Sequence, residues 1–225
     1  MSTSSLVPAA TLIGERVRAA YYGILIADAL SMPVHWFYNR ADIKRAFPGG
    51  VRGYEAAPKV HPSSIMPLSS TGASGGRGAQ TGDIIGRVIN HGRKHLWGVP
   101  NQHYHTGMKA GENTLNAILA RVTARAVLGL PPLAGPAGSP PAGPTPAAAL
   151  AAGAPYNAAH FLAAYVPFMT TPGTHNDTYA ETHIRQFYGN FAKGRPPAEC
   201  ADNDGHNTWV YSPKAAKNTT ARPTE

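Results

Sequence analysis

Apolar residues recur at helical spacing in several segments of this chain. In residues 11–30 they return every three or four positions, which is the period of one helix face. The same period follows Glu112 and ends at Gly129, before two prolines that stop a helix. Residues 84–89 are rich in isoleucine and valine and predict a short helix with Asp83 as its N-cap. No segment alternates apolar and polar residues as a half-buried strand does, so the sequence predicts an all-α fold with long loops.

The second half of the chain predicts two more helices. Asn157 starts the first, in which aromatic and aliphatic residues recur at helical spacing. Thr178 and Glu181 have the spacing of a capping box for the second, which ends at Gly194, before Pro196. The side chains of this last helix that we expect to face the core are Phe187, Tyr188 and Phe191.

Residues 130–155 interrupt the helical pattern with a tract of proline, alanine and glycine. The tract lacks the large apolar side chains that bury a segment against a core, so it is predicted to be a disordered insertion. It separates an N-terminal helical part, residues 11–129, from its continuation in residues 156–211. A disordered N-terminus, residues 1–10, and a polar tail, residues 212–225, complete the predicted organisation.

The composition argues against several classes of function. The net charge is +8, but only 14% of the residues are charged and no run of five basic residues occurs, which disfavours a nucleic-acid partner. No apolar run is long enough for a signal peptide or a membrane span. Cys200 is the single cysteine, so no intrachain disulfide forms and a reducing compartment is the default. We therefore expect a cytoplasmic location, with an organellar transit peptide as the alternative, because the first residues are rich in serine and alanine and poor in acids.

Three oxygen-bearing side chains stand at the start of the helix that follows Glu112. Asn113 is the predicted N-cap, because its side-chain carbonyl can accept from backbone N–H groups two or three residues further on. Glu112, Asn113 and Thr114 also offer the carboxylate, amide and hydroxyl oxygens that hold a hard cation. The sequence leaves both roles open, as a helix cap and as a set of metal ligands.

A stretch rich in glycine, serine and proline lies upstream, and it contains Gly75, Gly76 and Arg77. Backbone N–H groups of a glycine-rich loop can approach a phosphate closely, because no Cβ intervenes. No Walker or dinucleotide-binding motif fits this stretch, and a flexible surface loop is an equal alternative.

Histidines, and one aspartate inside an apolar helix, are further candidates. The chain has ten histidines, and several of them, among them His103 and His105, are spaced as in zinc sites. The usual partners of such sites are missing, so we favour loop histidines that form hydrogen bonds, although His105 is close enough to Glu112 in sequence to line one pocket. Asp28 must find hydrogen-bond partners or stay exposed, and its favoured role is to organise the loop after its helix.

Three segments together resemble the ADP-ribosylglycohydrolase family. Residues 23–35, with the sequence GILIADALSMPVH, resemble the opening helix of that family and its GDALGxPxE-like exit. Residues 112–114 are similar to the Thr-Asp-Asp-Thr segment that opens a later helix and binds magnesium in the family. Residues 174–177, with the sequence THND, resemble a further recurring segment. The resemblance covers residues 17–127 and 156–205.

This resemblance implies an enzyme with a multi-helix orthogonal bundle that hydrolyses the C1″ glycosidic bond of ADP-ribose conjugates with the help of Mg²⁺. Carried over by position, Glu112 is the catalytic carboxylate, and Glu112, Asn113 and Thr114 are the metal ligands. An ADP-ribosylated substrate or an ADP-ribose-like small molecule is the implied partner. The residues implied to bind the substrate are Asp28, His35, Gly75, Gly76, Arg77, His105 and His175.

The chain departs from the family pattern at the metal ligands. Asn113 replaces an aspartate and His35 a glutamate, which removes negative charge, weakens the attraction for Mg²⁺ and makes another divalent ion an alternative. The family has an Asp-x-Asp-Ser/Thr ligand segment near its C-terminus, whereas Asp202 and Asp204 are followed here by an unpatterned tail. We therefore expect an incomplete domain. The alternative function is a catalytically inactive protein that binds ADP-ribose or a nucleotide, or a helical interaction protein.

Overall fold

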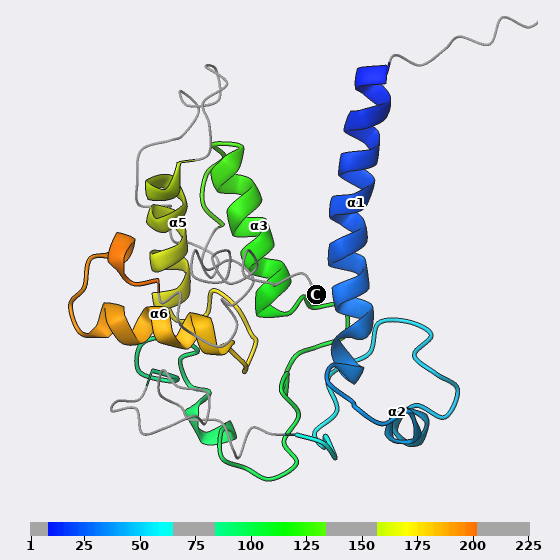
Figure 1. Ribbon diagram of the computed structural model, residues 1–225. Coiled ribbons are helices and arrows are strands. Elements are labelled where there is room, and N and C mark those ends of the chain that lie inside the picture. The colour runs from blue at the N-terminus through cyan, green and yellow to red at the C-terminus, as the bar shows by residue number, and fades with distance from the viewer. Residues whose placement is uncertain (1–8, 65–83, 134–156, 202–225) are drawn as a thin grey trace, which may run out of the picture.

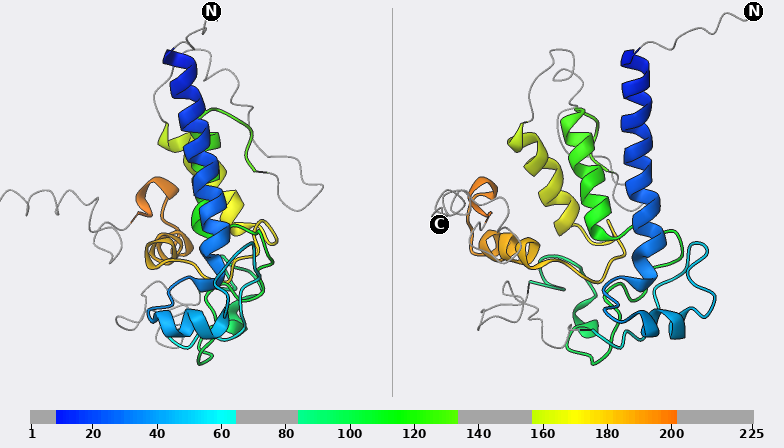
Figure 2. Two further views of the ribbon diagram at one scale, coloured as in Figure 1. Left: turned by 90° about the vertical axis from the view of Figure 1, so that its right-hand side faces the viewer. Right: turned by 45° about the vertical axis from the view of Figure 1, so that its right-hand side comes forward.

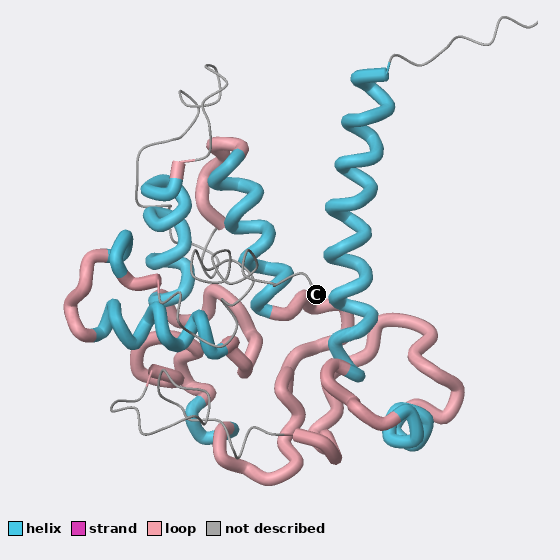
Figure 3. Tube along the Cα trace, viewed as in Figure 1, coloured by secondary structure: helices cyan, strands magenta, loops and turns pink. Residues whose placement is uncertain are grey.

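Five α-helices form the framework of the computed structural model, which describes residues 9–64, 84–133 and 157–201. Within these ranges no β-strand forms, and long loops join the helices (Figure 3). The predicted helical class is therefore confirmed for this part of the chain. The α-helices are α1 Ala9–Ser31, α2 Arg40–Ala46, α3 Leu115–Val127, α5 Ala158–Thr170 and α6 Thr182–Ala192, and the short 3₁₀ helices are η1 Met32–Val34, η3 Lys94–Leu96 and η4 Pro197–Glu199.

The helices α3 and α5 lie side by side, and α6 crosses near one end of the pair (Figure 1 and Figure 2). The C-terminal end of α1 meets the start of α3, and α2 lies close to that end. The N-terminal half of α1 extends away from the other helices, and its side chains Ile13 and Val17 are 61% and 64% exposed. Ile24, in the C-terminal half, is 57% exposed. The apolar stripe predicted this helix, but most of the stripe does not enter the core.

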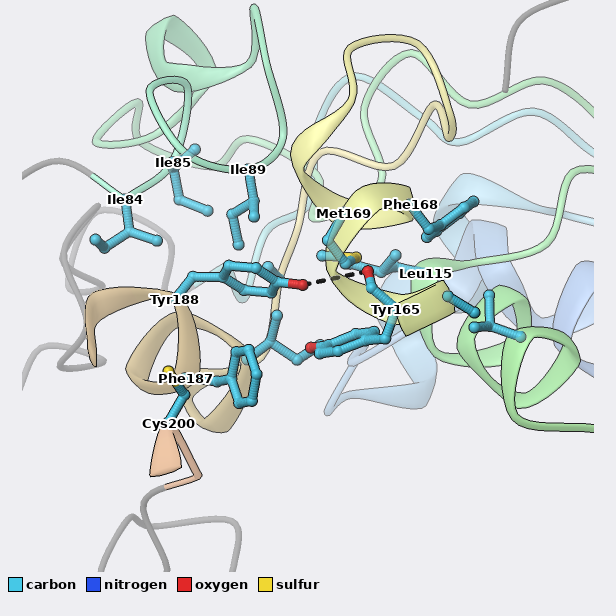
Figure 4. Close-up of a cluster of buried hydrophobic side chains, with 14 of the residues drawn as sticks. Ile84, Ile85, Ile89, Leu115, Tyr165, Phe168, Met169, Phe187, Tyr188 and Cys200 are labelled. Atoms are coloured by element: carbon cyan, nitrogen blue, oxygen red, sulfur yellow. Dashed lines mark hydrogen bonds between the residues drawn. The ribbon is translucent and has the colours of Figure 1, made fainter. Parts of the chain in front are cut away.

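The core lies between α3, α5, α6 and the loop of residues 84–97 (Figure 4). Tyr165 of α5 and Tyr188 of α6 meet there, and the Tyr188 hydroxyl donates to the Tyr165 carbonyl at 3.3 Å. Tyr188 is fully buried, so this bond satisfies a hydroxyl that would otherwise cost free energy in apolar surroundings. The apolar side chains around the pair include Ile84, Ile85, Ile89, Leu115, Phe168, Met169 and Phe187.

Two helices agree closely with their sequence signals. The helix predicted over residues 11–30 is confirmed as α1, and it ends where Pro33 follows. The predicted start of α5 at Asn157 is confirmed, and Asn157 is its N-cap, since its side-chain oxygen accepts from the backbone N–H groups of Ala159 and His160. Both predictions depend on residues that are close together in sequence.

The capping box predicted for α6 is wrong. The helix begins at Thr182 with Glu181 as its N-cap, and this residue makes no side-chain cap bond. Thr178 instead donates its hydroxyl hydrogen to the carbonyl of Thr106, which joins it to another loop. The predicted inward face of the helix is confirmed by the burial or partial burial of Phe187, Tyr188 and Phe191.

The short helix predicted over residues 84–89 is also wrong, because this segment forms turns. Gly86 has a φ of +87°, and a Cβ at this position would lie 2.8 Å from the Cβ of Lys94. Only glycine suits such a left-handed, close-packed turn. The isoleucines of the segment are buried, so their apolar character reflects a place in the core rather than a helix. Asp83, its predicted N-cap, lies outside the described residues.

Several other predictions fall outside the described residues, which exclude positions 1–8, 65–83, 134–156 and 202–225. They concern the disordered N-terminus, most of the proline-rich insertion, the Asp202–Asp204 segment and the polar tail. Among the helices of the described ranges, none is both long and apolar enough to cross a membrane.

Replacing Ile184 by alanine is expected to lower the free energy of unfolding by about 3 kcal/mol, because the change leaves a cavity in the core. The Ile184 side chain is 1% exposed, whereas Ile26 on α1 is 48% exposed and serves as the matched control. Ile26→Ala is expected to change the free energy of unfolding by about 0.5 kcal/mol or less. Urea unfolding followed by circular dichroism measures both variants, and equal losses would contradict this assignment of the core.

Candidate functional site

Two carboxylates from different segments hold the start of α3. Asp28 of α1 accepts from the backbone N–H of Thr114 at 2.8 Å and from the Thr114 hydroxyl at 2.6 Å. Asp177 accepts from the backbone N–H of Leu115 at 2.7 Å. N–H groups at a helix start have no partner within the helix, and negative charge is favourable there. The two aspartates therefore join α1 and the loop before α6 to the same helix end.

Asn113 is not the N-cap of α3, contrary to the prediction. The N-cap is Thr114, and its side chain makes no cap bond. The amide group of Asn113 donates to the Leu25 carbonyl at 2.6 Å and to the Asp28 carboxylate at 3.1 Å. Asp28 thus finds the hydrogen-bond partners that its place in an apolar helix requires. These partners lie in the segment before α3 rather than in the loop after α1.

Asp177 is a buried carboxylate with three donors. Besides Leu115, the Nδ1 atom of His105 and the backbone N–H of Tyr179 lie 2.8 and 3.1 Å from its oxygens. Burial by itself raises the pKa of a carboxyl group. The charge and hydrogen bond of His105, together with the backbone N–H groups, outweigh burial and hold the pKa of Asp177 below its ordinary value. Asp177 is therefore a negative charge in the interior.

Two buried histidines, His61 and His103, bind the segment that leaves α1, and we call this pair the histidine clamp. The His61 Nε2–H donates to the His35 carbonyl at 2.9 Å, and the His103 Nε2–H donates to the Pro33 carbonyl at 3.2 Å. The Nδ1 atom of each ring accepts from the backbone N–H two residues further on. A ring that donates with one nitrogen and accepts with the other is neutral, so protonation costs each histidine a hydrogen bond.

Burial lowers the pKa of both histidines of the clamp. The pKa of His103 falls to about 3, because burial disfavours the charged ring and His105 and His61 repel a positive charge there. A further histidine contact reaches the same segment, since His105 Nε2 lies 2.7 Å from His35 Nδ1. These contacts agree with the role in hydrogen bonding that the sequence favours for the loop histidines.

A cavity of about 550 Å³ lies beside the start of α3. Glu112, on its wall, accepts from the backbone N–H of Lys109 at 2.6 Å and from the Asn176 amide at 3.0 Å. Arg93 donates to the side-chain oxygen of Asn176, so this asparagine joins an arginine to a carboxylate. The residues of the wall that bear on its chemistry are Arg93, Met108, Glu112, Ile118, Arg121 and His175.

Positive groups predominate on the wall of this cavity. Arg93 and Arg121 carry full charges, whereas Glu112 is the only carboxylate among the described lining residues. The Nδ1 atom of His175 is buried without a hydrogen-bond partner in the described ranges, and burial lowers the pKa of this ring. His175 is therefore neutral near pH 7 and adds no positive charge to the wall. The charges of the wall favour an anionic ligand.

The site residues predicted from the sequence do not all meet. Glu112, Asn113 and His175 line the cavity, whereas Asp28 and Thr114 bind each other beside it. His35 and His105, which the sequence also predicted, contact each other next to Asp177. The predicted glycine loop of residues 75–77 lies outside the described residues.

Sequence reasoning missed three residues of this region, Arg93, Arg121 and Asp177. Arg121 follows Ile118 by three positions on α3 and so shares its face, a spacing from which it could have been found. Asp177 belongs to the segment that carries the family resemblance, but no pattern around it indicates that it accepts from the start of α3. Arg93 lies in a loop whose sequence carries no signal.

The residues predicted as Mg²⁺ ligands bind protein groups in this structure, and the metal site stays a prediction. Mg²⁺ requires near-octahedral oxygen donors with carboxylates among them. Thr114 directs its hydroxyl hydrogen, and Asn113 its amide nitrogen, to Asp28, whereas Glu112 binds other partners. The two arginines of the cavity wall repel a divalent cation. In the part of the chain that the structure describes, no group of three or more His, Cys, Asp or Glu side chains is arranged to hold a metal ion.

Acidification is expected to destabilise the fold through the histidine clamp. Below about pH 6.5 the unfolded chain takes up protons on its histidines. The folded state does so only at lower pH, because the pKa of His103 is lowered to about 3. For His103 alone, the free energy of unfolding at pH 5 is therefore expected to be about 2 kcal/mol smaller than at neutral pH. Urea unfolding near neutral pH and near pH 5 measures this difference.

The variant His103→Gln checks that His103 causes the predicted loss of stability at pH 5. Glutamine takes up no proton, so this variant is expected to lose about 2 kcal/mol less stability than the wild type over the same pH interval. His160→Gln, at an exposed position of α5, is the control and is expected to keep the wild-type pH dependence. A wild-type pH dependence in His103→Gln would contradict the role of the clamp.

Comparisons with protein-family models, with curated proteins and with solved structures find no match to this chain. The resemblance of three short segments to ADP-ribosylglycohydrolases remains a prediction from the sequence. Function must therefore be inferred from the residues of the site and their geometry.

Proposed function

We propose that the cavity beside α3 binds a small anionic molecule of the nucleotide type, for which ADP-ribose is the candidate that the sequence resemblance suggests. The observation that carries this proposal is the pair of arginines, Arg93 and Arg121, that line one cavity from separate segments. Arginine presents planar donors that match phosphate oxygens in pairs. A diphosphate group offers anionic oxygens to both side chains at once.

Arg121 is the more available of the two cations. Within the described ranges it has no hydrogen-bond or ion-pair partner, whereas Arg93 donates to Asn176. A cation without a partner in the protein loses no internal bond when a phosphate arrives. Arg121 is therefore the residue on which we expect anion binding to depend most.

The size and the apolar surface of the cavity also suit such a ligand. Its volume of about 550 Å³ falls within the range of roughly 300–1,000 Å³ that small-molecule pockets occupy. Met108 and Ile118 provide apolar surface for a base or a sugar face. Both protein donors to Glu112 reach its Oε2 atom, which leaves Oε1 to accept from hydroxyl groups of a ribose.

Binding without hydrolysis is the function that this geometry supports best. The resemblance implies metal-assisted cleavage with Glu112 as the catalytic carboxylate, and that activity stays a prediction. The arginines of the wall oppose a divalent cation, whereas they attract the phosphates of the ligand itself. We therefore infer a binding protein for ADP-ribose or a related nucleotide.

Calorimetric titration in the presence of EDTA is expected to show that the protein binds ADP-ribose and ADP without divalent metal. Adenosine is expected to bind about tenfold more weakly or worse, because hydrogen bonds to charged groups contribute about 1.5–3 kcal/mol each. Arg121→Gln is expected to weaken ADP-ribose binding by about tenfold or more, since it removes both the charge and the paired donors.

Arg125→Gln is the matched control, because Arg125 lies one turn further along α3 and donates to the Pro131 carbonyl outside the cavity. This variant is expected to keep the wild-type affinity for ADP-ribose. Equal affinities for adenosine and ADP, or an equal loss in Arg121→Gln and Arg125→Gln, would contradict an anion site. Binding that appears only after addition of Mg²⁺ would favour the metal-dependent hydrolase instead.

A further inference from the structure

Asp177, His105 and His35 form a continuous series of hydrogen bonds. Asp177 Oδ1 lies 2.8 Å from His105 Nδ1, and His105 Nε2 lies 2.7 Å from His35 Nδ1. Asp177 and His105 are buried, whereas His35 is partly exposed. The series therefore runs from a charge in the interior to a ring at the surface.

The charges determine where the protons of this series lie. Asp177 is anionic and can only accept, so the Nδ1 atom of His105 carries its hydrogen. With the Nδ1–H of His35 as donor and His105 Nε2 as acceptor, the bond between the two rings leaves both rings uncharged. Burial and the neighbouring His105 lower the pKa of His35, which keeps that ring neutral near pH 7. The lone pair of His35 is then on Nε2.

The Nε2 atom of His35 is the open end of the series. In the described ranges this atom has no hydrogen-bond partner, and His35 is partly exposed. The Trp36 indole stacks on the His35 ring with 4.5 Å between centroids and 3° between planes. Trp36 holds this position with a φ of +57°, a left-handed conformation that favours glycine and costs free energy at a bulky residue.

We propose that Asp177 and His105 form a proton relay that makes His35 Nε2 a nucleophile toward neutral, activated acyl esters. In the Ser-His-Asp arrangement, a buried aspartate orients a histidine that takes the proton of the attacking group. The same order holds here, with the imidazole of His35 in the place of the hydroxyl, and histidine is a known covalent nucleophile. His35 is the catalytic residue of this site, and His105 and Asp177 are positioning residues.

The charges around His35 select the type of electrophile. The carboxylates of Asp28 and Asp177 both act on the His35 ring, and the other ionisable groups that do so are the rings of His61 and His105. Two negative charges repel an anionic substrate such as a phosphate ester, whereas an uncharged ester carbonyl meets no such repulsion. The Trp36 indole offers apolar surface for an acyl or aryl group. This site is separate from the anion-binding cavity and does not depend on its ligand.

The reaction balances with water as the second reactant. His35 Nε2 forms a bond to the carbonyl carbon, the bond from that carbon to the leaving oxygen breaks, and the leaving group departs with the electron pair. The Nδ1 proton of His35 passes to His105 Nε2, and Asp177 stabilises the resulting charge. Water then attacks the acyl carbon, the bond to Nε2 breaks, and His105 returns the proton to His35. The products are the carboxylate, the leaving anion and two protons in solution.

Hydrolysis of p-nitrophenyl acetate by the full chain tests this relay. The release of p-nitrophenolate is expected to exceed that of free imidazole at equal concentration by about tenfold or more, and to fall to the background in His35→Gln. Diethyl pyrocarbonate, a second neutral acyl reagent, is expected to modify His35 first, as peptide mass spectrometry can show. His95→Gln, at an exposed position of η3, is the matched control and is expected to keep the wild-type rate.

The variant His105→Gln distinguishes the relay from simple exposure of His35. Glutamine can form a hydrogen bond but cannot take up the proton, so the rate is expected to fall about tenfold and its pH profile to change. Circular dichroism checks that this variant is folded, which we expect because the bond from Leu115 to Asp177 remains. A wild-type rate in His35→Gln, a wild-type rate and pH profile in folded His105→Gln, or a wild-type protein no faster than imidazole would each overturn the proposal.

Discussion

The start of α3 depends on two carboxylates that belong to other parts of the chain. Asp28 and Asp177 accept from consecutive backbone N–H groups, those of Thr114 and Leu115. Without these acceptors the two donors would lie between packed elements with no partner, which costs free energy. The same side chains hold the end of α1 against α3 and fix the ring of His105. One helix end therefore organises both the cavity wall and the histidine series.

The loop before α6 contributes residues to both of these regions. Asn176 lies on the cavity wall, where it binds Glu112 and Arg93. The next residue, Asp177, faces the interior and binds His105. Consecutive residues of one short segment therefore connect the wall of the anion-binding cavity with the histidine series.

Sequence signals predicted those features that depend on neighbours in the chain. The apolar period of α1 and the start of α5 at Asn157 depend on residues a few positions apart, and the sequence predicted both. Asn113 has the side chain of an N-cap, but Asp177 accepts from the backbone N–H of Leu115 instead. The two residues are 62 positions apart in sequence, so no local pattern predicts this contact. Residues 84–89 have the apolar composition of a short helix, and their sequence did not indicate the turns that they form. The cavity could be predicted only in part, since its arginines come from separate segments and carry no motif.

The contacts that build the site also determine when it can form. The bonds from Thr114 to Asp28 and from His35 to His105 close loops of 86 and 70 residues, whereas the bond from Tyr188 to Tyr165 in the core spans 23 residues. Closing a long loop costs chain entropy before its contacts can offset that loss, so non-local contacts slow folding. We expect α3, α5 and α6 to pack before the end of α1 docks on them. The site is then the part of the molecule that a folding chain completes last and a partly unfolded chain loses first.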